Sequence, residues 1–182
     1  MGRVLTGFVL GVLATVLLAL VSGYVYFGQG MAPVATSAPP MPFEVRLAHM
    51  ALRARLAREM PGEAPMPADE VNLAAGARVY VQHCAVCHGV PGAEPTAIAR
   101  GEFPKPPHLF RGKGVTDDPP AETHWKVANG IRMTGMPGFG KSLSTDEMWQ
   151  VSLLLASADK LPVGVRAGLA NGSAAGPIVS AK

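Results

Sequence analysis

Both cysteines of the chain stand in one short segment, His83-Cys84-Ala-Val-Cys87-His88. Three kinds of chemistry use two cysteines that are separated by two residues: a thiol redox pair, half of a metal site, or the covalent anchor of a larger group. Each of them requires a different surrounding fold. This motif therefore constrains the architecture more than any other feature of the sequence.

Two of these three chemistries lack support elsewhere in the chain. A thioredoxin-like redox pair lies near a βαβ pattern, which the sequence does not show. A structural zinc site needs a second pair of ligands at finger or ribbon spacing, and there is no further cysteine. The remaining pattern is C-x-x-C-H, which attaches a c-type haem. Cys84 and Cys87 are then predicted to bond the two vinyl groups of the porphyrin, and His88 is predicted to ligate the iron.

A ligand for the opposite face of the iron is expected in the segment Asn129–Gly140, which offers Met133 and Met136. Met136 stands in a loop fixed by glycine and proline, so its thioether can be held at the iron. Met133 is nearer to the end of a predicted helix and is expected in the core. The alternative ligands are His108 and His124. Methionine opposite histidine raises the reduction potential relative to two histidines.

The segment from Val4 to Phe27 is almost wholly apolar, and no charged residue occurs between Arg3 and Glu44. As a helix, this segment would be roughly 36 Å long at about 1.5 Å per residue, enough to cross a hydrocarbon core of ~30 Å. A cleaved signal peptide is the alternative, although its apolar region is usually shorter. We expect an uncleaved anchor with Arg3 in the cytoplasm and the rest of the chain across the membrane.

Six regions follow from the pattern of apolar, Pro-rich and charged residues. The segment 43–60 is rich in arginine and has a helical pattern with apolar residues on one face. A helix packed on the main domain or acting as a spacer is the simpler interpretation, and a membrane-surface or partner-docking helix is the alternative. The predicted regions are a cytoplasmic N-terminus (1–3), a transmembrane anchor (4–27), a Pro/Ala-rich tether (28–42), the amphipathic Arg-rich helix (43–60), a compact domain (69–160) and a disordered tail (161–182).

The compact domain is predicted to be all-α. Three helical segments are expected, at 69–84, 120–131 and 144–160, the last with a capping box of Ser144 and Glu147. More than thirty residues dense in Gly and Pro separate the first two and show no strand alternation, so a bulky cofactor is needed to complete the core. Residues 69–160 hold ten acidic and nine basic residues. This balance gives no support for nucleic-acid binding.

With these features the chain resembles a membrane-anchored monohaem class I cytochrome c, a type found in bacterial respiratory chains. The resemblance rests on Cys84, Cys87 and His88, on the methionine loop Gly130–Gly140, and on the closing amphipathic helix. It implies a small helical domain wrapped around one covalent haem c with its iron.

Two less specific matches to this family precede the cysteines. In that family, a glycine and an aromatic residue stand eight and four residues before the first haem cysteine, and Gly76 and Tyr80 occupy these positions. The resemblance implies that Gly76 lets the closing helix approach the first helix near Trp149 or Leu153.

The family also has a P-x-L triplet after the haem histidine, whose proline carbonyl accepts the imidazole Nδ1–H. Pro107-His108-Leu109 matches this triplet, with Pro106 as the fallback and a plain loop proline as the simplest alternative. Such a bond would fix the ring of His88 and tune its basicity as a ligand.

The expected function is one-electron transfer by a tethered carrier that is not an enzyme. The resemblance implies an inner bacterial membrane with the haem domain on the periplasmic side, and other redox proteins as electron donor and acceptor. One alternative is an integral haem subunit of an oxidase or dehydrogenase complex. The other is a sensor or peroxidase with a five-coordinate haem.

Overall fold

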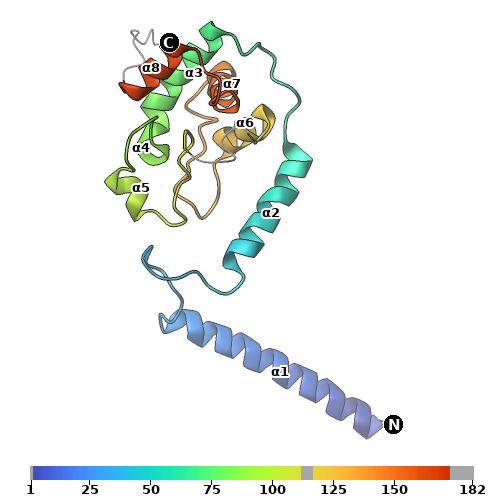
Figure 1. Cartoon of the computed structure of the whole chain (residues 1–182). Helices are drawn as coiled ribbons and strands as arrows, with labels where there is room; N and C mark the ends of the chain where they lie inside the picture. Colours follow the sequence, from blue (N-terminus) through green and yellow to red (C-terminus); the bar gives the residue numbers. More distant parts are fainter. Residues whose placement is uncertain (1, 112–116, 173–182) are drawn as a thin grey trace. The chain divides into compact units, whose positions relative to one another are not determined.

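The computed structural model describes residues 2–111 and 117–172, and within them it contains α-helices and no β-strand (Figure 1). The chain divides into two compact units, Met1–Val45 and Arg46–Lys182. The helices are α1 (Gly2–Gly28), α2 (Glu44–Glu59), α3 (Glu70–His83), α4 (Ala85–His88), α5 (Ala97–Gly101), α6 (Pro120–Asn129), α7 (Thr145–Ala156) and α8 (Val163–Ala170). The predicted all-α class is confirmed.

Helix α1 is long and apolar enough to cross a membrane, by length and composition. A signal sequence near an N-terminus passes the same test. The hydroxyl groups of Thr6 and Thr15 donate to the carbonyls of Gly2 and Gly11, each at 2.9 Å. Its two threonine hydroxyls therefore need no partner outside the helix, as an apolar surrounding requires.

The helices of the second unit begin where the sequence places their caps. The Asp69 carboxylate accepts the backbone N–H of Asn72 at the start of α3. Helix α6 has Pro120 in its first turn. Ser144 and Glu147 form the predicted capping box of α7, since each side chain bonds the other residue's backbone N–H. These caps satisfy N–H groups that the helices themselves leave without partners.

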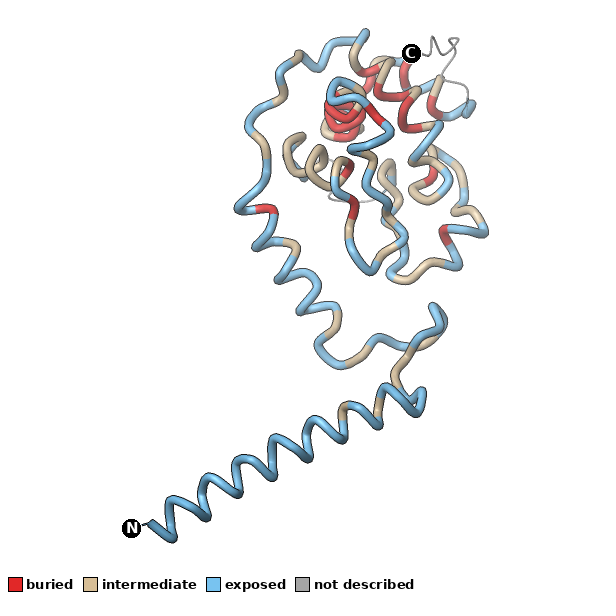
Figure 2. The backbone as a smooth tube through the Cα atoms, turned by 180° about the vertical axis from the view of Figure 1, so that it is seen from behind, coloured by how far each residue is buried: buried red, intermediate tan, exposed pale blue. Residues whose placement is uncertain are grey.

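The core of this unit forms where α7 packs against α3 and α6, with α8 also on α3. Tyr80, Val151, Leu154 and Leu169 are fully buried there. Figure 2 shows buried residues concentrated in these helices, whereas α1 contains no buried residue. Gly76 of α3 lies directly against the backbone of Gln150 and Val151 in α7. The expected approach of the two helices at Gly76 is therefore present, with Gln150 and Val151 as the contacting residues.

The C-terminal segment differs from the prediction of a disordered tail beginning at residue 161. Leu161, Val165 and Leu169 are buried in the core, and the last two stand on α8. Their spacing of four residues places them on one helical face, which packs against α3. The prediction was wrong for residues 161–172 because small residues masked this short apolar repeat. The rest of the predicted tail, 173–182, lies outside the described residues.

The long connection between α4 and α6 also contains more structure than its composition indicates. Thr96 caps the short helix α5 by accepting the N–H of Ala99 at 3.1 Å. The Thr96 hydroxyl also donates to the carbonyl of Val86 at 2.6 Å, which ties this segment to α4. Residues 112–116 of the connection lie outside the described residues.

We expect Gly76→Ala to destabilise the second unit by about 1–3 kcal/mol, because the added methyl group would lie 2.6 Å from the Gln150 carbonyl carbon. Gly101→Ala is the control, since a Cβ there meets nothing within 4 Å. Urea unfolding followed by circular dichroism would measure both. Equal stability of the two variants would contradict the close approach of α3 and α7.

Candidate functional site

One helical turn carries both cysteines and the adjacent histidine. The N–H of Cys84 donates to the carbonyl of Tyr80 at 2.9 Å, so Cys84 ends α3. The carbonyl of Cys84 then accepts the N–H groups of Cys87 at 3.1 Å and His88 at 2.9 Å. Residues three and four positions apart share one face of a helix. The turn therefore presents the two thiols and the imidazole to the same side.

The imidazole of His88 is oriented by a backbone carbonyl. Its Nδ1 lies 2.8 Å from the carbonyl oxygen of Pro107, the contact that the family resemblance implies. Because a carbonyl only accepts, Nδ1 carries the proton and Nε2 keeps a free lone pair. Burial lowers the pKa of His88, partly opposed by this hydrogen bond. The ring is thus held neutral, the form that ligates metals.

The two thiols are half-buried and are not joined in a disulfide. Burial, followed by the charge of Cys87, raises the pKa of Cys84 to about 12. Burial also raises the pKa of Cys87, and the thiol of Cys87 donates to Oε1 of Glu102 at 3.2 Å. Both groups are therefore protonated thiols at neutral pH.

Tyr80 fixes the residue that follows this turn. Its buried hydroxyl donates to the carbonyl of Gly89 at 2.7 Å, and its ring meets that of Phe110 edge-on at 5.0 Å. Burial raises the pKa of Tyr80 far above its ordinary value, so the hydroxyl remains a donor. Gly89 has φ of +74°, which glycine adopts without strain.

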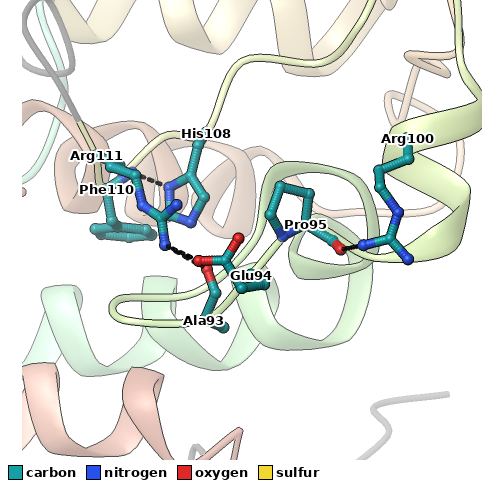
Figure 3. Close-up of polar contacts among 7 residues, drawn as sticks. All are labelled: Ala93, Glu94, Pro95, Arg100, His108, Phe110 and Arg111. Atoms are coloured by element: carbon teal, nitrogen blue, oxygen red, sulfur yellow. Dashed lines mark hydrogen bonds and ion pairs between the residues drawn. The ribbon is translucent and has the colours of Figure 1, made fainter.

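Arginine side chains hold the loop between α4 and α5 (Figure 3). Arg111 donates to the carbonyl of Ala93 at 2.8 Å and pairs with Glu94 at 3.3 Å. Arg100 donates to the carbonyl of Pro95 at 2.6 Å. These contacts fix the ends of the segment that leads to Pro107.

The two other histidines considered as ligands lie in different settings. Nδ1 of His108 accepts the N–H of Phe110 at 3.2 Å, and a Cβ on Gly89 would meet its Nε2 at 2.6 Å. His108 is thus on the His88 side of the site. The ring of His124 stacks on Trp149 with centroids 4.1 Å apart. Neither buried Nε2 has a hydrogen-bond partner within residues 2–111 and 117–172.

The methionine loop is folded back on α6. The N–H of Phe139 donates to the carbonyl of Val127 at 2.8 Å, and the N–H of Ile131 donates to the carbonyl of Met136 at 3.2 Å. The N–H of Met136 donates to the Thr134 hydroxyl at 3.1 Å. Met136 is half-buried against the core. Met133 is 83% exposed with φ of +60°, so the expectation of a core position for it was wrong.

Glu102 links the cysteine turn to this loop and was missed by the sequence analysis. Its carboxyl group accepts from Cys87, and its Cδ lies 2.7 Å from where a Cβ of Gly135 would be. Gly135 directly precedes Met136, so the loop lies near the face that carries the thiols. A lone glutamate in a Gly- and Pro-rich stretch gives no sequence signal for such a role.

This donor set fits a covalent haem. Two protonated thiols and a neutral imidazole with a free Nε2 share one face, and a thioether stands in the neighbouring loop. Thiols bond the vinyl groups of haem c, while imidazole and thioether are its common iron ligands.

One comparison with known proteins matches the part of the chain that carries these residues. Residues 71–153 match the family model described as cytochrome C oxidase, cbb3-type, subunit III. A chain of the reducing HAO-like protein complex of Kuenenia stuttgartiensis is 28% identical, with a TM-score of 0.45. That match covers 52% of this chain and 46% of the other. The search of curated proteins found no match.

We expect Tyr80→Phe to lose about 1–3 kcal/mol of stability, because the buried carbonyl of Gly89 would lose its partner. Phenylalanine retains the ring and its contact with Phe110, so the loss measures the hydrogen bond. Thermal and urea unfolding of the variant and the native protein would test this. A variant as stable as the native protein would show that the bond does not support the site.

Proposed function

Residues 71–153 form a cytochrome c domain of the monohaem class I type, whose cofactor is covalent haem c with iron, and from this premise we propose that the protein is a membrane-tethered one-electron carrier. Cys84 and Cys87 would hold the haem as thioethers. His88 and Met136 would ligate its iron, and Pro107 would orient His88. The bound group supplies the ferrous/ferric couple, and the chain's residues control its ligation and surroundings.

The observation that carries this proposal is the 2.8 Å contact from His88 Nδ1 to the Pro107 carbonyl. It leaves Nε2 as the ligating atom and prevents rotation of the ring. Tyr80, through Gly89, stabilises the turn that bears both thiols. A ligand held in this way needs little rearrangement when the iron changes charge.

Met136 is the best-supported second ligand. Backbone hydrogen bonds of Met136 to Thr134 and Ile131 fix its loop. The preceding residue, Gly135, lies beside Glu102, and the Glu102 carboxyl group accepts from the thiol of Cys87. His108 lies beside Gly89, on the side of the first ligand. With His88 and Met136 both bound to the iron, no iron position would remain for a substrate. This favours a carrier over a sensor or peroxidase.

We further propose that α1 is a retained anchor in the inner membrane of a bacterium. Arg3 would stay in the cytoplasm, and the haem domain would then lie on the periplasmic side. Fifteen residues separate α1 from α2 and reach at most about 50 Å when fully extended. This tether would raise the effective concentration of the domain for membrane-bound redox partners.

A subunit of a larger oxidase is the second candidate, and the description of the matched family favours it. The electron-transfer chemistry would be the same, with fixed partners. Solubilisation in mild detergent followed by size-exclusion chromatography separates the two: a free carrier elutes alone, and a subunit elutes with a large complex.

We expect Met136→Ala to abolish the weak far-red absorption band of the ferric protein that reports an iron–sulfur bond to methionine. Met133→Ala is the matched control and should retain the band, since Met133 is 83% exposed. Visible spectra and carbon monoxide binding of the ferrous proteins would measure this. Loss of the band in Met133→Ala, or its absence from the native protein, would contradict the ligand assignment.

We expect Glu102→Gln to raise the reduction potential by tens of millivolts. The carboxylate contacts the sulfur of Cys87, and a negative charge at the porphyrin edge favours the ferric iron. Glu94→Gln is the control, because Glu94 is 83% exposed and pairs with Arg111. Spectroelectrochemical titration would compare the two. Equal shifts would show that Glu102 has no particular effect on the haem.

A further inference from the structure

Helix α2 has two apolar faces with different surroundings. On one face Leu56 is buried, at 7% exposure, and Leu52 is half-buried. The other carries Leu47 and Met50, which are 56% and 61% exposed. Ala54 and Ala57 continue this second face and are also exposed. The positions are spaced by three, four and three residues, so they form one stripe along the helix, called here the docking face.

Arginines stand along both edges of the docking face. Arg46 and Arg53 flank it on one side and Arg58 on the other, at helical offsets of three and four residues from its members. In the part of the chain that the structure describes, none of these three makes an ion pair. Arg55 points elsewhere on the helix and pairs with Glu59 at 2.7 Å.

We propose that the docking face lies on the anionic headgroups of the membrane that α1 spans. This inference rests on the anchoring part of the proposed function. Guanidinium groups bind phosphate with paired hydrogen bonds, and clustered basic residues close to a membrane span are attracted to anionic lipids. Leu47 and Met50 would enter the boundary between headgroups and acyl chains.

A lipid surface fits this face better than a protein groove. Two of its four residues are alanines, so the stripe projects little from the helix. Only Leu47 and Met50 have long side chains that could enter a groove. Arginines on both edges match a plane of phosphates that extends to either side. The fifteen-residue tether keeps the helix within about 50 Å of the bilayer, so a weak affinity is sufficient.

The docking would limit where the haem domain can travel. Helix α3 begins at Glu70, and ten residues follow the end of α2 at Glu59 before it. A helix held on the lipid surface would keep the domain close to the membrane, rather than at the full length of chain between α1 and α3. Redox partners whose haem or flavin lies close to the membrane surface would then be favoured.

The test uses the full haem-loaded chain in vesicles of phosphatidylcholine, with or without phosphatidylglycerol. Spin labels would be attached at Met50→Cys on the docking face and at Ala48→Cys, an exposed position on another face. We expect the Met50 label to lose collisions with a water-soluble relaxant and gain collisions with oxygen only in anionic vesicles. The Ala48 label should remain accessible to water in both.

Two variants of the same helix, each lacking one arginine charge, form a matched pair. Arg53→Gln should reduce the protection of the Met50 label in anionic vesicles, whereas Arg55→Gln should not, because Arg55 lies off the docking face. Equal effects of the two variants would overturn a role for the arginine edge.

The controls separate this inference from the proposed function. Retention in vesicles after an alkaline wash reports the α1 anchor, and the visible spectrum reports the haem. An anchored, haem-loaded protein whose Met50 label stays accessible to water in anionic vesicles would overturn the inference alone. Protection only in native membranes would also overturn it, in favour of a protein partner. Release of the protein by the alkaline wash would contradict both the α1 anchor and this inference, but it would not contradict the carrier function.

Discussion

The hydrogen bond from His88 to the Pro107 carbonyl joins two parts of the chain on which the rest of the site depends. On one side, the turn from Cys84 to His88 holds both thiols on the same face as the imidazole. On the other, the Pro-rich loop follows a path secured by Arg100 and Arg111. Other hydrogen bonds also tie the loop to the cysteine turn, but without this one the ring of His88 would be free to rotate.

Much of this arrangement was predictable because its signals are local. The spacing of Cys84, Cys87 and His88 is set by one helical turn, and the cap residues Asp69 and Ser144 satisfy backbone groups within three residues of themselves. Glycine at position 76 was identified through a family pattern, and the contact with α7 gives it a steric reason.

The features that sequence reasoning missed depend on distant contacts. Helix α8 is stable because Val165 and Leu169 reach α3, a contact that its small-residue composition does not reveal. Met133 was expected in the core, yet a left-handed backbone at this residue turns the loop and exposes the side chain. Glu102 meets Cys87 only because the loop after α5 returns to the cysteine turn.

Proton NMR of the ferrous protein with methyl-labelled methionine would show whether Met136 binds the iron opposite His88. A methionine bound at the iron lies in the ring current of the porphyrin. We expect one strongly upfield-shifted methionine methyl signal, which should be absent from Met136→Leu. A native spectrum in which all methionine methyl signals keep ordinary positions would contradict it.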